Sequence, residues 1–333
     1  MNHKSYLAGD RSYFSLIKKD IHKTVTSAGF DANKINEIDI IVSEVTSNLY
    51  KHANGGELLA KVENLPHNEY FELISIDYGP GITDISKVLS DGYSSTNTLG
   101  HGLGSIKRLS DEFDIYSLKS WGTVILSRVY KATSLTHLKN EPVFKALNIP
   151  KPGEQVSGDG YCFCKTGEGF KVLIADGLGH GTEAHHAASE ACRAFRICTD
   201  NSPSETLRYI HNLIRKTRGA VATAVFYDAS KKTWSISGVG NIAVRWNGGT
   251  SNRNYGGYNG IVGHNIPNSL SDQELAQEEF QQFIACSDGI RSRWDYSRLP
   301  LIQRHDPAVL AAAIYKEFGR RTDDTSVIIC KVI

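Results

Sequence analysis

The sequence predicts an α+β protein of two domains, in which runs of helix and runs of strand are largely separate. A chain of 333 residues is too long for one ordinary core and suits two domains of usual size. The first part has glycine-rich loops after helices and strands, whereas the second has Asp-Gly dipeptides at the ends of apolar runs. A polar stretch over 132–139 lies between them. We therefore expect domains at 1–131 and 140–333, joined by a linker.

The composition is that of a soluble globular protein, with 40% hydrophobic and 22% charged residues. A net charge of +1 gives no general electrostatic attraction to nucleic acid or to an anionic membrane. No apolar run reaches membrane-spanning length, and charged residues follow the start where a signal peptide would need an apolar segment. We expect a cytoplasmic protein without nucleic-acid or membrane partners. Its six cysteines lack zinc-site spacing, which favours reduced, packed thiols.

The first domain begins with two predicted amphipathic helices, because apolar residues recur at helical spacing over 10–29 and 32–53. Glu44 and Asn48 recur beside the apolar stripe of the second helix. Glycines 55 and 56 then break the helix. Beyond them the pattern predicts strands at 57–63 and 70–77, a helix at about 105–112 and a last pair of strands ending near residue 130.

The second domain is predicted to contain short apolar strands around three helices. The strands are expected at 170–175, 220–227, 233–239, 280–286 and 325–332. The helices are expected at about 183–198, 204–216 and 307–318. No internal repeat relates the two halves, so they are expected to differ in fold.

The first half contains the parts of an ATP site. Glu44 and Asn48 lie one helical turn apart, so Asn48 can offer an oxygen ligand to Mg²⁺ while Glu44 serves as a base in the same cleft. Asp77 ends a strand, where it can accept a hydrogen bond from an adenine amino group. Glycines let the backbone approach the base, and a helix start binds phosphate through free amide groups. These glycines are Gly79, Gly81, Gly100, Gly102 and Gly104.

Taken singly, each of these features is also typical of a solvated helix face or a turn. Their order and separation resemble the GHKL ATPases, an α/β sandwich with the Bergerat fold, and specifically the small serine kinases of the anti-sigma-factor type. The resemblance covers about 10–130 and rests on residues 44–48, 77–82, 100–104 and 106–113.

This resemblance implies that Glu44 is the base, that Asn48 binds Mg²⁺, and that Asp77 and Thr123 contact the adenine of ATP. No phosphoacceptor-histidine helix pair lies ahead of the fold, which argues against a sensor histidine kinase. A serine or threonine on another protein is the expected acceptor.

The second half contains four aspartates beside apolar runs. Asp176 and Asp288 each follow such a run, Asp324 precedes one, and Asp159 lies between two glycines. Hard divalent ions prefer carboxylates and water, and two such ions can drive hydrolysis of a phosphomonoester near neutral pH. A single Asp-Gly dipeptide is more typical of a turn. Four aspartates so placed favour a paired metal centre.

The aspartates and their flanking residues resemble the metal-dependent type 2C (PPM) protein phosphatases, in particular the compact SpoIIE-like branch. The resemblance rests on residues 152–159, 175–181, 287–289 and 323–326. It implies an αββα sandwich in which Asp176 bridges two Mn²⁺ or Mg²⁺ ions and the carbonyl of Gly177 completes one site. Asp288 and Asp324 complete the other site, and Asp159 acts through water.

Two nearby features leave alternatives open. His180 could reach the phosphate or donate a proton, although a loop histidine after Gly179 is more often solvated. Gly240 and Asn241 fall at the family's loop between central strands, where a structural turn is an equally good interpretation.

Together the two halves predict a bifunctional partner-switching regulator. It would combine an ATP-dependent protein serine kinase with a metal-dependent phosphoserine and phosphothreonine phosphatase, both acting on STAS-type antagonist or stressosome proteins. A sigma-factor regulator or a downstream phosphatase is a further partner that the resemblance suggests. One alternative is a phosphatase regulated by a non-catalytic, ATP-dependent binding module. Another is a scaffold with two decayed sites, which the retained Glu44, Asn48 and four aspartates count against.

Overall fold

The computed structural model describes residues 2–65, 68–89, 102–132, 142–248 and 251–332. Contacts divide the chain into two compact units. Apart from the first two residues, the first unit comprises 3–137 and 297–313, and the second comprises 138–296 and 314–333. The expected linker, 132–139, lies almost entirely outside the described residues.

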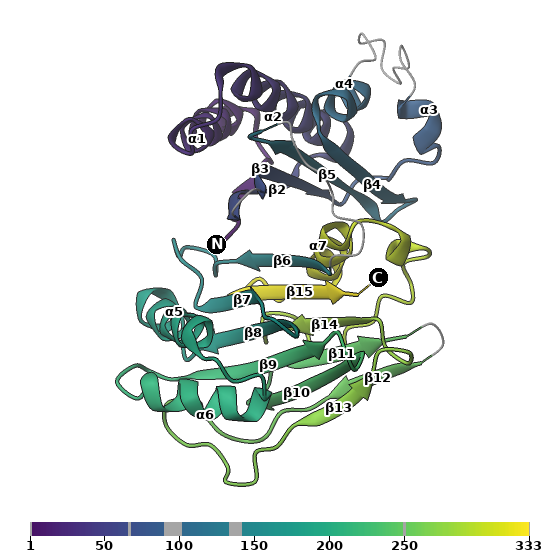
Figure 1. Cartoon of the computed structure of the whole chain (residues 1–333). Helices are drawn as coiled ribbons and strands as arrows, with labels where there is room; N and C mark the ends of the chain where they lie inside the picture. The colour runs from purple at the N-terminus through teal and green to yellow at the C-terminus, as the bar shows by residue number, and fades with distance from the viewer. Residues whose placement is uncertain (1, 66–67, 90–101, 133–141, 249–250, 333) are drawn as a thin grey trace. The chain divides into compact units, whose positions relative to one another are not determined.

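The first unit is a five-stranded antiparallel sheet in the order β1-β2-β3-β5-β4, with helices against one face (Figure 1). The long helix α2 (Ala32–Ala53) begins after Asp31, whose carboxylate accepts a hydrogen bond from the Lys34 amide. It ends before Asn54, which has a left-handed backbone conformation. The elements are β1 (Lys4–Leu7), α1 (Phe14–Ser27), α2 (Ala32–Ala53), β2 (Gly56–Leu65), β3 (Asn68–Asp77), α3 (Ile85–Leu89), α4 (Gly102–Leu109), β4 (Glu112–Leu118) and β5 (Gly122–Tyr130).

The core of this unit lies between the helices and the sheet. The apolar stripes of α1 and α2 meet alternate residues of β2 and β3, because side chains on a strand alternate between faces. Ile21, Ile38, Leu58 and Phe71 are among the side chains buried there. The packing holds α2, and with it Glu44 and Asn48, against the sheet.

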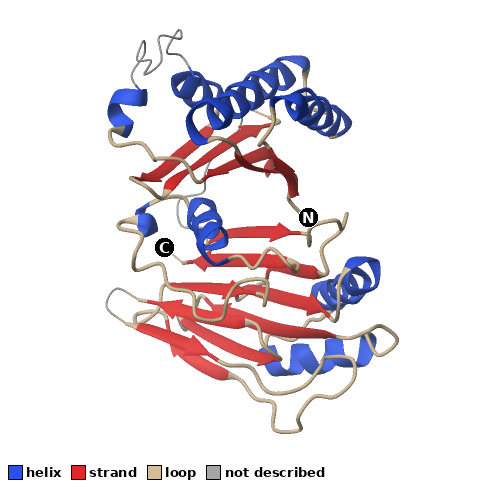
Figure 2. Ribbon diagram, turned by 180° about the vertical axis from the view of Figure 1, so that it is seen from behind, coloured by secondary structure: helices blue, strands red, loops and turns tan. Residues whose placement is uncertain are grey.

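The second unit contains two five-stranded antiparallel sheets, in the orders β13-β10-β9-β8-β7 and β12-β11-β14-β15-β6. Its helices α5 and α6 cover the first of these sheets (Figure 2). The elements are β6 (Val143–Ile149), β7 (Asp159–Lys165), β8 (Gly169–Gly177), α5 (Gly181–Ile197), α6 (Pro203–Leu213), β9 (Ala220–Asp228), β10 (Thr233–Val239), β11 (Ala243–Asn247), β12 (Asn252–Tyr255), β13 (Gln273–Ala276), β14 (Gln282–Cys286), α7 (Pro307–Phe318) and β15 (Thr325–Lys331). The contact division falls within α7.

Two apolar layers hold this unit together. Aromatic side chains fill the space between the sheets, where Trp234 packs edge-on against both Trp246 and Phe283. Small residues form the layer beneath the helices, because alanines of α5 lie directly over β7 and β8. The fold class predicted from the sequence is therefore confirmed.

Several details differ from the sequence prediction. The helix expected at about 105–112 is α4, which begins at Gly102 and ends at Leu109, so Gly102 and Gly104 lie inside its first turn. Glu112 begins a strand instead. The edge strand β1 and the strands β6, β7, β11, β12 and β13 were not predicted, because their residues mix polar and apolar types without a clear period.

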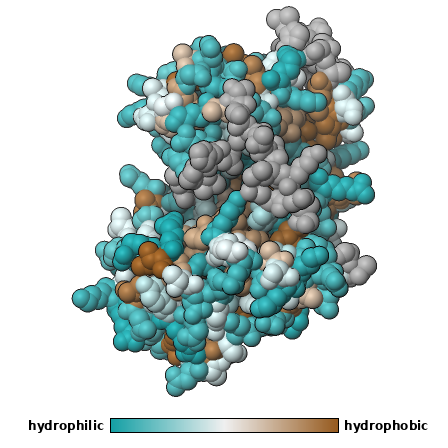
Figure 3. Space-filling view, viewed as in Figure 1, coloured by the Kyte–Doolittle hydropathy of each residue, from teal (hydrophilic) through white to brown (hydrophobic). Residues whose placement is uncertain are grey.

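Among the described residues, no helix is long and apolar enough to span a membrane. The face of the molecule drawn in Figure 3 is mostly hydrophilic, with hydrophobic residues in small separate groups. The hydrophilic surface is consistent with the burial of the apolar residues of helices such as α1 and α2 in the core.

Candidate functional sites

The first pair of predicted metal ligands is brought together by a strand pair. In the antiparallel ladder between β7 and β8, Asp159 lies directly opposite Asp176. Directly opposed residues project from the same face of a sheet. The two carboxylates therefore project from the same face of the first sheet, at the start of β7 and the end of β8.

The second pair comes from the other sheet. Asp288 follows the end of β14, and Asp324 immediately precedes β15. These strands are antiparallel neighbours, and the Ser287 amide donates to the Ser326 carbonyl at 3.1 Å just beyond their last register pair. The end of β14, with Asp288, and the start of β15, with Asp324, thus lie side by side at the same end of this strand pair.

Glycines beside three of these aspartates allow close packing. A Cβ on Gly158 would stand 2.8 Å from Oδ2 of Asp324, and one on Gly289 would stand 2.1 Å from the Asp324 carbonyl oxygen. A Cβ on Gly177 would lie 2.1 Å from the Ala184 carbonyl oxygen, so this position fixes the approach of α5. The Asp-Gly dipeptides therefore have a packing reason in addition to any role in a turn.

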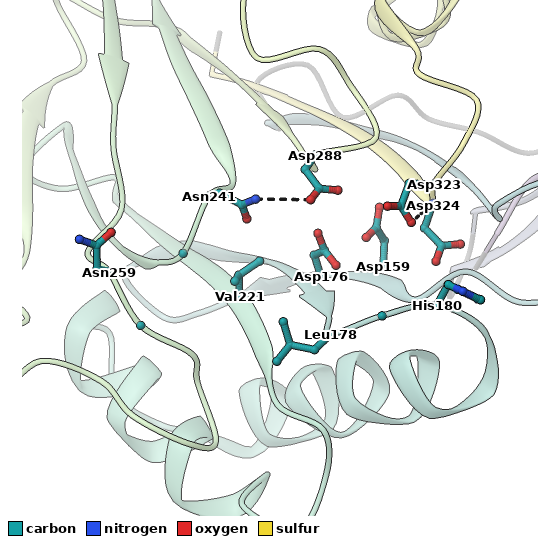
Figure 4. Close-up of a pocket in the computed structure, with 13 residues that line it drawn as sticks. Asp159, Asp176, Leu178, His180, Val221, Asn241, Asn259, Asp288, Asp323 and Asp324 are labelled. Carbon is teal, nitrogen blue, oxygen red and sulfur yellow. Dashed lines mark hydrogen bonds between the residues drawn. The ribbon is translucent and has the colours of Figure 1, made fainter.

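All four aspartates line one pocket of about 400 Å³. Figure 4 shows Asp159, Asp176 and Asp288 with their carboxylates directed toward the same space, and Asn241 joined to Asp288. The Asn241 amide donates to Oδ2 of Asp288 at 3.4 Å. Gly177 does not line the pocket, so the predicted role of its carbonyl stays a prediction. The complete lining is Asp159, Asp176, Leu178, Gly179, His180, Val221, Gly240, Asn241, Asn259, Gly260, Asp288, Asp323 and Asp324.

The electrostatics of the pocket disfavour ionised carboxylates that lack a cation. Burial raises the pKa of Asp159 to about 7, with help from Asp324 and Asp288, although the nearby Ser287 and Ser326 hydroxyls oppose the rise. Burial and the negative charge of Asp159 raise the pKa of Asp176 to about 9. Burial also raises the pKa of Asp324. Converging acids with raised pKa values are typical of functional sites.

The carboxylates have free coordination capacity. Both oxygens of Asp159 and Oδ2 of Asp324 are buried without a hydrogen-bond partner in ordinary geometry. Within the described part of the chain, no three His, Cys, Asp or Glu side chains stand close enough to hold one ion by themselves. Divalent ions here would therefore need water and backbone carbonyls as additional ligands. This donor set of oxygens fits Mg²⁺ or Mn²⁺.

Three polar residues of the pocket, Asp323, Asn241 and Asn259, were not assigned a role from the sequence. Asp323 adjoins a predicted ligand, and Oδ1 of its carboxylate accepts a hydrogen bond from the Asp324 amide at 3.0 Å. Asn241 and Asn259 stand beside glycines with positive φ, at 102° for Gly240 and 149° for Gly260. The only sequence signal for them was these turn dipeptides, which occur in many loops. His180 also lines the pocket, and its Nδ1 lies 2.8 Å from Oε1 of Glu154.

In the first unit, Glu44 and Asn48 converge on the start of α4. A Cβ on Gly102 would stand 3.2 Å from Oε2 of Glu44 and 3.2 Å from Oδ1 of Asn48. Any larger residue at position 102 would crowd both side chains. The amide nitrogen of Asn48 is buried and unpartnered. The structure thus joins three of the predicted nucleotide-site residues.

The predicted adenine-binding residues, Asp77 and Thr123, lie at the end of β3 and the start of β5. Oδ1 of Asp77 accepts hydrogen bonds from the Gly79 amide at 2.8 Å and the Thr123 amide at 3.2 Å. Gly81 has a φ of 75°, and a Cβ there would lie 2.0 Å from the Leu118 carbonyl oxygen. Gly122 likewise leaves no room for a Cβ beside Asp77. The loop therefore requires glycine where the sequence provides it.

The glycine-rich phosphate loop is only partly described. Gly102 and Gly104 lie in the first turn of α4, and Gly104 is buried. Gly100 lies outside the described residues, so its predicted contact with phosphate stays a prediction.

Comparison with known families decides the identity of the two halves. Residues 10–128 match the histidine kinase-like ATPase domain. Residues 166–333, half of the chain, match the stage II sporulation protein E (SpoIIE) family. The chain belongs to the SpoIIE family. Its first unit adds a histidine kinase-like ATPase domain to the SpoIIE-type phosphatase domain.

Relatives of each half are known. The chain is 37% identical to the serine/threonine-protein kinase RsbT of Bacillus subtilis (strain 168) over 97 residues, which are 29% of this chain and 73% of RsbT. A structure from work on the bacterial stressosome as a modular system for secondary messenger signalling is 27% identical. It covers 57% of this SpoIIE-family chain and 100% of its own, with a TM-score of 0.53. The structure of RsbX in complex with magnesium is 16% identical. The match covers 58% of this chain and 96% of RsbX with a TM-score of 0.51, and it supports the fold alone.

Proposed function

We propose that this SpoIIE-family chain is a bifunctional partner-switching regulator, which phosphorylates STAS-type proteins with its first domain and dephosphorylates phosphoserine or phosphothreonine with its second. The convergence of Asp159, Asp176, Asp288 and Asp324 on one pocket is the observation that carries the proposal. Its raised pKa values and unpartnered oxygens favour cation binding over a structural role.

In the phosphatase, two divalent ions would supply a nucleophilic water at neutral pH and neutralise the phosphate. The carboxylate of Asp176 faces the same space as those of Asp159 and Asp288, which suits a residue that would be a ligand of both ions (Figure 4). The carbonyl of Gly177 would complete one ion site, and Asp288 and Asp324 would complete the other. Asp159 is buried, at 3% exposure, and would act through water.

In the kinase, Asn48 would bind Mg²⁺ and Glu44 would accept the proton of the acceptor hydroxyl. The contact of both with Gly102 puts them beside the amide groups at the start of α4, where phosphate binds favourably. Asp77 and Thr123 would hold the adenine. The 37% identity to RsbT supports kinase activity, and the similarity to a structure from stressosome work supports STAS-domain substrates.

The test is a pair of assays on the full chain with purified STAS proteins from the same genome. We expect ATP-dependent phosphorylation of a serine or threonine, and Mn²⁺- or Mg²⁺-dependent removal of that phosphate. Hydrolysis that persists unchanged in EDTA would overturn the phosphatase proposal. Nucleotide-dependent capture of the STAS protein without transfer would instead establish the first domain as a binding module.

A further inference from the structure

The candidate phosphatase pocket has a strongly one-sided charge. Five aspartates line it, and no lysine or arginine is among its described lining residues. Two divalent ions would offset four of the five negative charges if all the carboxylates were ionised. A phosphomonoester dianion would then meet a site without surplus positive charge. Substrate binding would therefore gain from a cation at the pocket wall.

Arg218 is a cation that the fold brings beside this wall. Its Nη1 lies 3.1 Å from the point where a Cβ on the pocket-lining Gly179 would stand. Gly179 has a φ of 91°, so glycine is favoured there and no side chain separates the guanidinium from the loop. The guanidinium therefore lies directly beside a segment that lines the pocket.

The backbone of Arg218 is held between two parts of the pocket wall. On one side, the Leu178 amide donates to the Gly219 carbonyl at 3.1 Å. On the other, the Arg218 carbonyl lies 2.8 Å from Nε2 of His264, in the segment that follows the pocket-lining Asn259 and Gly260. Gly219, with a φ of 78°, packs against this segment. The base of the side chain is thus fixed at the junction of both walls.

The guanidinium itself has no competing partner. Within the described residues, it forms no ion pair or side-chain hydrogen bond, and the residue is exposed. An unpaired guanidinium presents a planar fork of donors that matches two phosphate oxygens. By contrast, the pocket-lining His180 is already paired with Glu154.

We propose that Arg218 binds the phosphate group of the substrate at the rim of the aspartate pocket and thereby selects phosphomonoester dianions. The inference rests on the proposed phosphatase function but concerns binding of the phosphate, which can be measured without turnover. Because Arg218 contributes to phosphate affinity and not to the metal ligands, its removal should weaken substrate binding more than the chemical step.

The test compares Arg218→Gln and Arg218→Lys with Lys216→Gln, a matched control at an exposed position of the same loop. Calorimetry of the Mn²⁺-loaded full chain would measure affinity for inorganic phosphate, and assays with p-nitrophenyl phosphate would give KM and kcat. A separate titration would measure Mn²⁺ affinity.

We expect Arg218→Gln to weaken inorganic phosphate binding and raise KM about tenfold or more, the usual effect of losing a charge-assisted hydrogen bond. Its kcat and Mn²⁺ affinity should stay within about threefold of the unsubstituted protein. Arg218→Lys should recover part of the affinity, because it keeps the charge but loses the fork.

Phosphate affinity equal to that of Lys216→Gln would overturn the proposal. So would a parallel loss of Mn²⁺ affinity, which would assign Arg218 to the integrity of the metal site. If the unsubstituted protein binds phosphate through Arg218 but hydrolyses no phosphomonoester, the phosphatase proposal fails while this one stands.

Discussion

Glu72 in the first unit and Asp159 in the second are both carboxylates on β-strands, at 1% and 3% exposure, yet their surroundings differ. Glu72 meets Nε of Arg128 at 2.6 Å, Nε2 of His3 at 3.1 Å and Nζ of Lys61 at 3.4 Å. Although burial opposes ionisation, the charges of Lys61 and Arg128 hold the pKa of Glu72 well below its usual value. Burial raises the pKa of Asp159 to about 7, and its carboxylate neighbours Asp324 and Asp288 add to the rise.

The difference separates a structural charge cluster from a functional one. Every charge around Glu72 is compensated within the protein, so the cluster can stabilise the fold without a ligand. The charge around Asp159 is not compensated, so the fold maintains a site that is complete only when cations bind. The balance of charge, and not the number of charges, therefore distinguishes the aspartate pocket from the cluster around Glu72.

The largest effect predicted from this comparison is on phosphatase activity. Asp176→Asn and Asp288→Asn should each lower Mn²⁺-dependent hydrolysis of p-nitrophenyl phosphate by at least about a hundredfold, because each removes a charged ligand from a two-ion site. Their thermal stability in EDTA should not fall, since the substitutions relieve repulsion among the aspartates. Variants that keep normal activity would show that these carboxylates bind no catalytic ion.

The next largest effect is expected at the nucleotide site, where Glu44 and Asn48 both lie 3.2 Å from the position of a Cβ on Gly102. Asn48→Ala should weaken Mg²⁺-ATP binding about tenfold or more, measured by calorimetry. Glu44→Gln should leave binding nearly intact but abolish transfer to a STAS protein, because a base acts only in the chemical step. Normal phosphate transfer by Glu44→Gln would remove Glu44 from the role of base.

For the compensated cluster, the expected effect is on stability. Glu72→Gln should lower the free energy of unfolding by about 3–5 kcal/mol, because it removes the buried carboxylate that Lys61 and Arg128 share. The matched control is Glu69→Gln, which breaks the more exposed 3.1 Å pair with Lys131 and should lower it by at most about 1 kcal/mol. Denaturant unfolding of the full chain measures both. Equal losses in the two variants would remove the distinction between the clusters.

The smallest predicted effect is the pH dependence of the metal-free protein. The folded-state pKa values of Asp159 and Asp176, about 7 and about 9, exceed those of unfolded aspartate, so the folded chain binds more protons between about pH 4 and 9. Their contribution to stability is present below this window and is lost as pH rises through it. Glu72 has the opposite sign, because its lowered pKa gives stability that is lost only in acid.

In EDTA, the melting temperature should therefore fall by several degrees between pH 5.5 and 8.5 through the aspartate pocket. Saturating Mn²⁺ should remove most of this decrease by compensating the carboxylates. An Asp176→Asn chain should show a smaller decrease in EDTA. A pH profile that is the same with and without Mn²⁺ would contradict the assignment.

Much of the fold and both candidate sites could be predicted from the sequence, because the signals were local. Val172 to Ala175 and Phe283 to Ser287 are short runs ending at an aspartate, which predicts both the strand and its functional end. The strand β10 and the helix α7 have the predicted bounds, since their apolar periods are clear and Pro307 begins the helix.

The remaining features depend on long-range pairing. The opposition of Asp159 and Asp176 depends on the β7–β8 register, and the approach of Asp324 to Gly158 joins positions far apart in the sequence. Arg218, Asn241 and Asn259 come from loops whose composition gives no period. Their relation to the pocket becomes apparent only once the strands are assembled.

The most direct test of the central claim is a calorimetric titration of Mn²⁺ into the full, metal-free chain at neutral pH. We predict binding of about two ions to the aspartate pocket with release of protons, because Asp159 and Asp176 must ionise to coordinate them. Asp176→Asn should lose this binding, whereas Glu72→Gln at a temperature where it stays folded should retain it. Absence of Mn²⁺ binding, or equal binding by the Asp176→Asn chain, would contradict the account.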